Sequence, residues 1–537
     1  MKDTRKRRER TVFLLACSAL ILAAAVSTRY FARLDLTASR AFTLSPAARS
    51  LHQSIPERVR ITYYISKNLS DKHPGPAAIE DFLRELEAVS RGKITVRTSD
   101  PSEDPTEAEG LGVAPQQMQV VERSEQRVAL VYTGLVIEYL DRYKVIPAVI
   151  STDTLEYEVV KNVRALVDDA DPAAGLLVGD ADKSVDQDYQ TLSAALGKAG
   201  YRIVTVQRGT AVPDDVTVLF VLGNAAMDRY DAYFVDQYLM RGGAAFLAVK
   251  GVDVNPDYGL AATAVPEGGL LPVLASYGLD VQRQLVLDES CLTVPFQTQG
   301  PRGGMSIQYL RYPHWMAVDP RFVDADNPIT AKFSGLDLFW PSPIVMKPVD
   351  GIEYGTLAKS TPNAWLQATR FMAGPQDAAM FGLERDSTGG QYVVAATAAG
   401  SFKSAFSAGD LPAREGAAAV PPPIPSSAPT RVVVVSSADF LTDLMRMSNS
   451  VFNVSFAVSA ADWLGSGADL IAIRARAETD PRLNRIKDEG TRAFLVTATY
   501  AVNLVLIPLA IVLAGAIRAM GRSRRERESR MARGGEA

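Results

Sequence analysis

Histidine and cysteine, the side chains that most often bind transition metals or act as nucleophiles, are rare in this sequence. The three histidines, His52, His73 and His314, stand too far apart for any zinc-binding spacing. The two cysteines, Cys17 and Cys291, belong to no Cys-x-x-Cys pair, and we expect no disulfide because Cys17 lies in an apolar run. These residues predict neither a metal site nor thiol redox chemistry.

Two glycine-containing segments partly match nucleotide-binding and nucleophile motifs. Residues 179–186, GDADKSVD, contain a Lys-Ser pair, but Asp182 stands where a P-loop needs a glycine that lets backbone amides approach phosphate. Residues 223–228, GNAAMD, follow an apolar run, where some hydrolases carry a nucleophile elbow. The Gly-x-Ser-x-Gly pattern is absent and Asn224 has no evident acid–base partner, so neither segment predicts catalysis.

Carboxylates are concentrated in two further segments, DPSEDPTEAE (100–109) and VDVNPDYG (252–259). The first is typical of a solvated acidic loop, with a weak cation site as the alternative, and the second lacks the full ligand set of a calcium loop. The sequence therefore predicts no catalytic residue, no cofactor and no metal ligand, and it favours a binding or scaffolding role.

Charge is distributed unevenly along the chain. Residues 1–10 carry six basic and two acidic side chains and residues 518–537 carry seven and three, so each end has a net charge of +4. Because the whole chain has −4, the remainder carries −12, and an acidic body of this kind disfavours nucleic-acid binding. The 537 residues predict two or three globular domains.

Two uncharged apolar runs lie next to the basic ends. Residues 11–28 have the length of a membrane anchor, although the small residues 23–25 also allow a cleaved signal peptide. Residues 493–517 form a longer run that ends at an arginine cluster and predicts a transmembrane helix. Asn503 and Pro508 inside it predict a face packed against another membrane helix, with a simple proline kink as the alternative.

The basic tips, residues 1–10 and 518–537, predict that both termini are cytoplasmic. We therefore expect a protein of the bacterial inner (cytoplasmic) membrane with the lipid bilayer among its partners. Residues 29–492 would then form a periplasmic body.

The body is expected to contain two α/β domains, of which the first spans residues 29–150. Strand-like segments at 59–66 and 91–100 flank a helical pattern at 76–90, and residues 118–149 add three strand-like segments. This order is similar to a thioredoxin-like arrangement that lacks the Cys-x-x-Cys motif.

The second domain, residues 151–476, alternates apolar strands with helices, which predicts a parallel, doubly wound sheet. A Pro/Ala/Ser-rich loop at 413–430 is expected to interrupt this domain, because a strand-like segment at 431–440 and a helical pattern at 454–465 follow it. Residues 477–492 would connect it to the second membrane helix.

Residues 34–51, LDLTASRAFTLSPAARSL, join the first apolar run to the first domain. Ser45 and Pro46 fit the N-cap and the first position of a helix, and Asp35 and Thr37 are expected to stabilise the turn before it. We therefore predict a structural collar next to the membrane rather than a catalytic loop.

Taken in order, several segments resemble the gliding-motility auxiliary (GldG-type) family of ABC-transporter-associated membrane proteins. Between the two anchors, the likeness is carried by RLDLTASRAFTLSPAARSL (33–51), RVRITYYIS (58–66), DFLRELEAVSRGKITVRTSDP (81–101), GLVIEYLDRYKVIP (134–147), LEYEVVKNVRAL (155–166) and YFVDQYLMRGGAAFLAV (233–249).

This resemblance implies an auxiliary or substrate-binding subunit that works beside a separate ABC ATPase and a polytopic permease and supplies a large outer domain. It also implies that the second domain is similar to a glutamine-amidotransferase-like fold without its active site. Two alternatives stay open. One is an envelope hydrolase or amidotransferase-like enzyme, and the other is a stand-alone receptor for a solute, lipid, peptide or glycan.

Overall fold

A computed structural model describes residues 43–70, 74–102, 104–122, 125–152, 154–167, 171–299, 305–331 and 333–466, and a few single residues between 497 and 515. The chain divides into two compact units, Met1–Glu478 and Thr479–Ala537. Both apolar runs lie wholly or largely outside the described residues. Within the described part, no helix is both long and apolar enough to cross a membrane.

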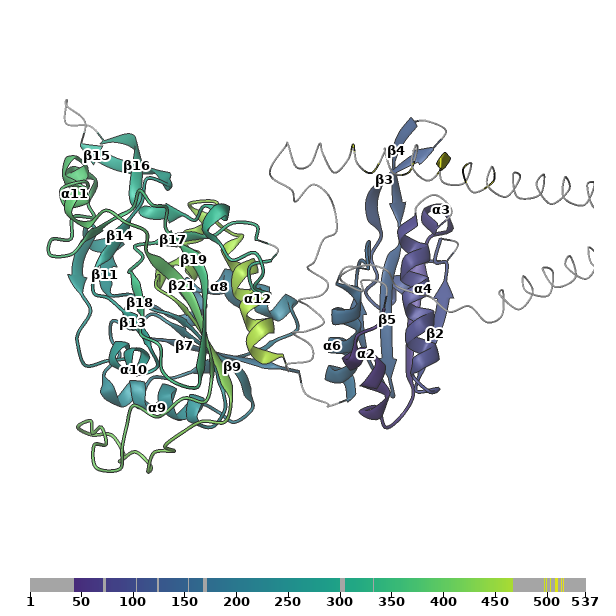
Figure 1. Ribbon diagram of the computed structural model, residues 1–537, viewed down its shortest axis with the longest axis horizontal. Helices are drawn as coiled ribbons and strands as arrows, with labels where there is room; N and C mark the ends of the chain where they lie inside the picture. The colour runs from purple at the N-terminus through teal and green to yellow at the C-terminus, as the bar shows by residue number, and fades with distance from the viewer. Residues whose placement is uncertain are drawn as a thin grey trace, which may run out of the picture. The chain divides into compact units, whose positions relative to one another are not determined.

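The first lobe, residues 43–167, is built on a four-stranded sheet (Figure 1). Its elements, in chain order, are α2 (Pro46–Ser50), η1 (Leu51–Gln53), β1 (Val59–Ile65), α3 (Lys67–Ser70), α4 (Pro74–Val89), β2 (Ile94–Ser99), α5 (Thr106–Gly110), β3 (Gln116–Glu122), β4 (Glu125–Val131), β5 (Thr133–Tyr139), β6 (Arg142–Ile146) and α6 (Leu155–Val167).

The strand order in this sheet is β2-β1-β5-β6. β1 and β2 are parallel and joined by α4, so the predicted strand-helix-strand unit is confirmed. β5 pairs antiparallel with β1 and with β6, while β3 and β4 form a separate hairpin, so residues 116–146 hold four strands rather than the three expected. Helices α4 and α6 bury their apolar sides in one core with β1 and β5.

The second lobe, residues 171–466, is built on a nine-stranded sheet. Its first half contains β7 (Ala173–Val178), α7 (Val185–Asp188), α8 (Gln190–Lys198), β8 (Arg202–Val206), β9 (Val216–Leu222), α9 (Arg229–Met240), β10 (Ala244–Ala248), β11 (Val252–Asn255), η2 (Pro256–Tyr258), β12 (Ala261–Ala264), α10 (Leu271–Ser276), β13 (Leu279–Val281) and β14 (Leu285–Leu287).

Its second half contains β15 (Cys291–Gln299), β16 (Met305–Ala317), η3 (Pro320–Phe322), β17 (Asp337–Phe339), β18 (Ile344–Met346), β19 (Ile352–Lys359), β20 (Trp365–Gln367), η4 (Pro375–Met380), α11 (Arg385–Thr388), β21 (Val393–Gly400), β22 (Thr430–Val435), η5 (Asp439–Leu441), η6 (Asp443–Arg446) and α12 (Asn453–Gly465).

The large sheet runs in the order β13-β18-β21-β22-β10-β9-β7-β8, with β19 added on β21. The neighbours β22, β10, β9, β7 and β8 are parallel, whereas β21 runs antiparallel to β22. Alternate strand residues point to opposite faces. One face packs against α8 and α12 and the other against α9 and α10, so helices cover both sides as the doubly wound prediction requires.

Three details of the second lobe differ from expectation. The sheet is mixed rather than parallel throughout, because β13, β18, β19 and β21 pair antiparallel with their neighbours. The helical pattern at 186–200 is divided into α7 and α8, because Tyr189 takes φ −126°, outside the helical range. The Pro-rich loop lies within a longer segment, residues 401–429, that joins the antiparallel neighbours β21 and β22. The loop therefore interrupts one sheet, as predicted, rather than separating two domains.

The predicted collar and membrane-helix residues are described only in part. The Ser45 hydroxyl accepts a hydrogen bond from the backbone N–H of Ala48 at 3.1 Å, with Pro46 at the start of α2. Asn503 donates to the Thr499 carbonyl at 2.9 Å. Asp35 and Thr37 lie outside the described residues, and the roles of the collar and of Asn503 and Pro508 stay predictions.

Candidate functional site

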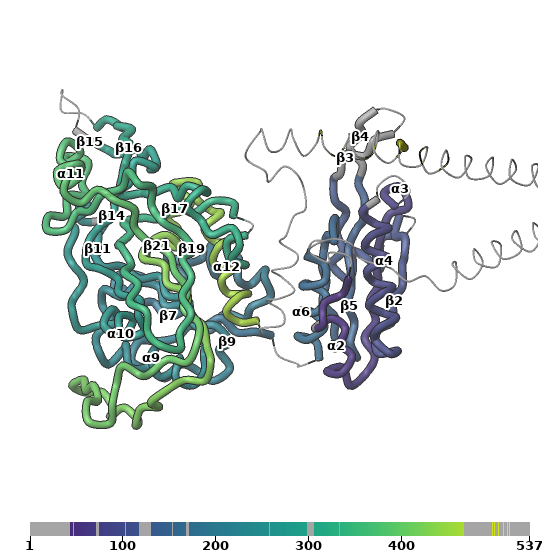
Figure 2. The backbone as a smooth tube through the Cα atoms, viewed as in Figure 1, coloured from purple at the N-terminus to yellow at the C-terminus, as the bar shows by residue number. Residues whose placement is uncertain are grey.

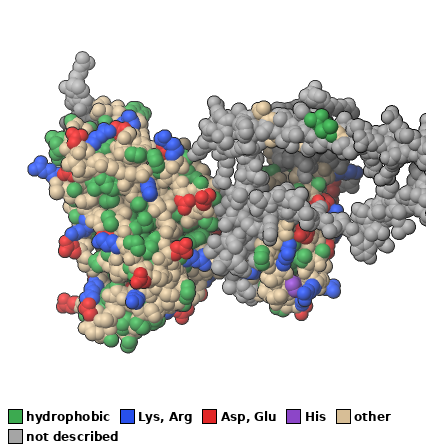
Figure 3. All heavy atoms as spheres, viewed as in Figure 1, with side chains coloured by type: hydrophobic (Ala, Val, Ile, Leu, Met, Phe, Trp, Pro, Cys, Tyr) green, Lys and Arg blue, Asp and Glu red, His purple; other side chains and the backbone are tan. Residues whose placement is uncertain are grey.

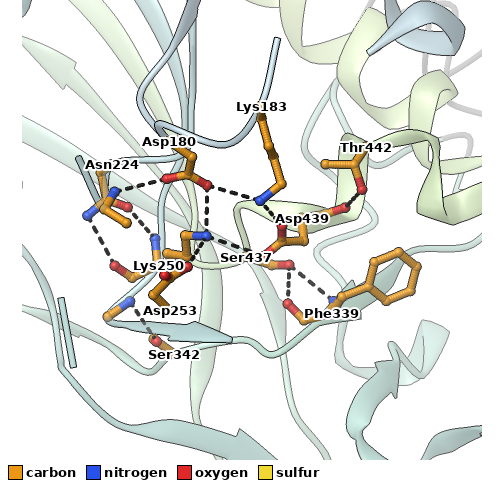
Figure 4. A network of polar contacts seen from close by, with 12 residues as sticks. Asp180, Lys183, Asn224, Lys250, Asp253, Phe339, Ser342, Ser437, Asp439 and Thr442 are labelled. Atoms are coloured by element: carbon orange, nitrogen blue, oxygen red, sulfur yellow. Dashed lines mark hydrogen bonds and ion pairs between the residues drawn. The ribbon is translucent and has the colours of Figure 1, made fainter. Parts of the chain in front are cut away.

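Polar side chains gather where four neighbouring parallel strands of the second lobe end. Asp180 follows β7, Asn224 follows β9, Lys250 follows β10 and Asp439 follows β22. Because these strands are parallel and adjacent, their carboxyl ends share one edge of the sheet and bring the four residues together (Figure 4). Doubly wound folds bind ligands at this edge, so we take it as the candidate site.

Lys250 lies at the centre of this group. Its Nζ is 2.7 Å from Asp180 Oδ2, 2.6 Å from Asp253 Oδ1 and 3.7 Å from Asp439 Oδ2. The side chains of Lys250 and Asp180 are each 2% exposed, whereas that of Asp253 is 37% exposed. Solvent therefore reaches this group from the side of Asp253.

Lys183 is the second cation of the group, with its Nζ 2.9 Å from Asp439 Oδ1 and 3.3 Å from Asp180 Oδ2. We name Asp180, Lys183, Lys250, Asp253 and Asp439 the ion cluster. Two lysines face three aspartates, so its formal charge is −1. A buried ion is costly unless its partners compensate it, and here each lysine is shared between at least two carboxylates.

The surroundings hold Lys250, Lys183 and Asp180 in their charged forms. Burial by itself would lower the pKa of Lys250 and of Lys183, but the carboxylates of Asp439 and Asp180 outweigh it and raise both lysine pKa values. Burial would likewise raise the pKa of Asp180, but the two ammonium groups bring it below its ordinary value. Neither lysine is therefore available as a neutral base or nucleophile at neutral pH.

The crevice between β7 and β9 is filled by the turns that follow these strands. A Cβ on Gly179 would lie 2.1 Å from the Gly223 carbonyl oxygen, and a Cβ on Gly223 would lie 2.4 Å from Asp180 Cγ. Gly223 also has φ +83°, a region that favours glycine. Asp180 Oδ1 accepts the N–H of Ala225 at 2.9 Å. The strand order reverses between β7 and β9, and ligands of doubly wound folds usually bind at such a switch point. Here the protein's own backbone occupies that space.

Asn224 holds two strand ends together instead of acting as a nucleophile. Its amide nitrogen donates to the Lys250 carbonyl at 3.1 Å, and its oxygen accepts the Lys250 N–H at 2.8 Å. Ser437 behaves similarly, since its hydroxyl donates to the Phe339 carbonyl at 2.7 Å and accepts the Phe339 N–H at 3.1 Å. Both polar groups are committed to the backbone.

Tyr189, at the break between α7 and α8, is buried close to the ion cluster. Burial raises its pKa well above the ordinary value, and the negative charges of Asp180 and Asp439 add to this. Its hydroxyl makes no hydrogen bond with the described residues. A phenol of this kind stays protonated at neutral pH, so it is a poor proton donor and supplies no phenolate base.

The residues considered in the sequence do not join this site. His314 is fully buried on β16, where burial lowers its pKa to about 4 despite a contact with Gln367. Cys291 is half-buried, and burial raises the pKa of its thiol. His52 lies on η1, and His73 lies outside the described residues. The described residues contain no group of three or more acidic, His or Cys side chains arranged to hold a metal ion.

The acidic segments behave differently from each other. In residues 100–109, Asp100 accepts the N–H of Ser102 at 2.9 Å and so forms a local turn. In residues 252–259, Asp253 belongs to the ion cluster, which sequence reasoning missed. Lys250 and Asp439 were not predicted as site residues either. Lys183 was considered only as part of residues 179–186, which do not complete a phosphate-binding loop. The available signal was a charged residue two to four positions after the apolar strands β7, β10 and β22.

Comparisons with known proteins place the second lobe in a transport context. Residues 171–463, more than half of the chain, match the family described as ABC-type uncharacterized transport system. Residues 38–138 match a domain of unknown function, DUF7088. An uncharacterized protein of Borreliella burgdorferi is 25% identical over 362 residues, which cover 66% of this chain and 68% of that protein.

Proposed function

The chain belongs to the family described as ABC-type uncharacterized transport system, and on that premise we propose that it is a non-catalytic auxiliary subunit of an ABC transporter complex. In this proposal it assembles with a separate ATPase and a polytopic permease. Its two lobes supply the outer domain of the complex, on thioredoxin-like and amidotransferase-like frameworks without active sites.

The closed sheet edge is the observation that supports a non-catalytic role. A hydrolase of this architecture needs an accessible nucleophile beside a base at the carboxyl ends of the strands. Among the described residues, this edge holds lysines paired with aspartates, and Asn224 stands at the elbow position bound to the backbone of Lys250. The ion cluster is best explained as a structural lock between β7, β10 and β22.

The proposal includes the topology expected from the sequence. Residues 11–28 and 493–517 would span the inner membrane, both basic tips would face the cytoplasm, and the lobes would lie in the periplasm. A relation to the gliding-motility auxiliary type of the family, and direct binding of a transported solute, are finer parts of the same proposal.

Co-purification tests the proposal. The full chain, tagged and expressed from its own locus, is solubilised in a mild detergent and isolated, and the recovered proteins are identified by mass spectrometry. We expect one ATPase and one polytopic permease at amounts comparable to the tagged chain. Recovery of neither subunit would refute the transporter role.

The substrate-binding part needs a separate measurement. A ligand that binds the folded chain raises its unfolding temperature by mass action, so the purified full chain is screened against sugars, peptides and lipids. A reproducible, concentration-dependent shift for one class would support direct binding. A flat response across the panel would leave the chain as a scaffold that binds only its partner subunits.

A further inference from the structure

The segment between β21 and β22, residues 401–429, forms a strap along α9. Figures 1 and 2 show it in green beside α9 at the lower end of the second lobe. Arg414 fixes its middle: Nε donates to Asp228 Oδ2 at 2.9 Å, and the guanidinium lies 4.7 Å from the centre of the Tyr230 ring. Asp228 also caps α9, so the strap is anchored to the start of this helix.

The proline-rich part of the strap, residues 420–425 with the sequence VPPPIP, is held by polar side chains of α9. The Tyr233 hydroxyl donates to the Pro421 carbonyl, and the Gln237 side-chain oxygen accepts the N–H of Ile424 at 2.7 Å. Downstream, the Pro425 carbonyl accepts the N–H of Ser404 at 3.0 Å. This stretch is fixed at both ends before any partner arrives.

Its sequence restricts this stretch to the polyproline II conformation. Each proline fixes its own φ, and each residue before a proline is kept out of the helical region. Polyproline II has three residues per turn, so side chains three positions apart form one ridge. Burial follows this period: Val420 is buried and Pro423 is half-buried, whereas Pro422 and Pro425 are both exposed.

One ridge therefore faces the lobe and two ridges face solvent. Val420 belongs to the core that includes Tyr230 and Tyr233. The second ridge consists of Pro421 and Ile424, which is 39% exposed, and the third of Pro422 and Pro425, about 9 Å apart along the axis. Residues 416–430 carry no charge, whereas charged side chains of both signs are scattered over the lobe face in Figure 3.

Two adjacent ridges of a polyproline II helix are what aromatic-lined grooves bind, and such a helix loses little entropy because it is already ordered. We propose that the outer ridges of residues 421–425 dock into an uncharged groove of aromatic side chains on the permease, with its Tyr or Trp groups donating to the carbonyls of Pro422 and Pro423. This inference rests on the proposed function, in which the ATPase is cytoplasmic and the permease is the partner subunit able to reach the strap.

The test compares two double variants of the full chain. Pro422→Ala/Pro425→Ala removes the third ridge. Pro266→Ala/Pro320→Ala is the matched control, since both of its prolines are exposed and lie outside the strap. Each chain is isolated in mild detergent, and the permease and ATPase that accompany it are quantified. A third variant, Ile424→Ser, shortens the second ridge while it retains every proline.

The ridge variant should recover about tenfold less permease than the control, as expected for removal of a docking hot spot. Ile424→Ser should reduce recovery severalfold, and all chains should keep their unfolding temperature. Equal recovery of permease by the ridge and control variants would overturn the inference while leaving the proposed function intact. Loss of self-association with unchanged permease would also overturn it, because the occupant would then be a second copy. Failure of the unaltered chain to recover permease would overturn the proposed function itself.

Discussion

Replacing Lys250 with methionine is a direct energetic test of the ion cluster. Methionine keeps the length of the side chain but removes the charge that lies within 2.7 Å of both Asp180 and Asp253. Asp180 and Asp439, 2% and 5% exposed, would then share Lys183 alone. Breaking a buried ion pair from one side costs about 3–5 kcal/mol, and we expect this loss in the free energy of unfolding of the second lobe.

Tryptophan fluorescence during urea unfolding can measure this loss, because the four tryptophans all lie in the second lobe, at Trp315, Trp340, Trp365 and Trp463. The matched control is Lys347→Met, which removes a lysine paired with Asp280 at 2.7 Å but 65% exposed. An exposed pair contributes at most about 1 kcal/mol. Equal losses in the two variants would refute the account of a buried, mutually compensating cluster.

A double variant tests whether Lys250 and Asp180 stabilise the lobe as a pair. Lys250→Met/Asp180→Asn removes one positive and one negative charge, so the cluster keeps its formal charge of −1. Replacing both partners of a buried pair is far less costly than removing one, and we expect the double variant to be more stable than Lys250→Met. A double variant as unstable as the sum of its two single variants would mean that the two side chains are not coupled.

Three further changes have defined outcomes. Ser45→Ala should destabilise the start of α2 by about 1 kcal/mol, measured as faster amide exchange in the first turn; unchanged exchange would contradict the cap. Gly223→Ala should lower the free energy of unfolding in urea by about 2 kcal/mol more than Gly200→Ala does, because both positions have positive φ but only a Cβ at Gly223 would clash with the Asp180 carboxyl. Equal losses in the two variants would argue against the filled crevice. The pKa of His314 falls from 6.5 to about 4 on folding, so the unfolded chain takes up the proton at a higher pH than the folded chain does. The free energy of unfolding of the lobe should therefore fall by up to about 3 kcal/mol as pH falls from about 6.5 to 4. His314→Gln should lack this part of the pH dependence, and a pH profile identical to that of the unaltered chain would refute the prediction.

Much of the secondary structure follows from local patterns in the sequence. The parallel β1–β2 pair with its crossover helix is readable because apolar residues change from a period of two to a period near four and back again. Continuous apolar runs in the sequence indicate β7, β9, β10 and β22, because a strand that is buried on both faces of a sheet needs apolar side chains on both. The expectation of three strands in residues 118–149 fails because β3 and β4 form a hairpin apart from the main sheet, and local patterning does not indicate which strands pair.

The candidate site depends on contacts that only the topology supplies. Asp180 and Asp439 are more than 250 positions apart in the chain, and their approach to Lys250 follows from the adjacency of β7, β9, β10 and β22. Lys183 resembles part of an incomplete phosphate loop when residues 179–186 are considered alone, because their neighbours in the chain do not indicate which strands meet there. The strand order turns these separate residues into one cluster.

Native mass spectrometry of the full chain, released from its own membrane in mild detergent, shows directly whether the chain is a transporter subunit. We expect one assembly that contains this chain together with an ABC ATPase and a polytopic permease. A spectrum in which the chain appears only alone or with copies of itself would contradict its role as a transporter subunit.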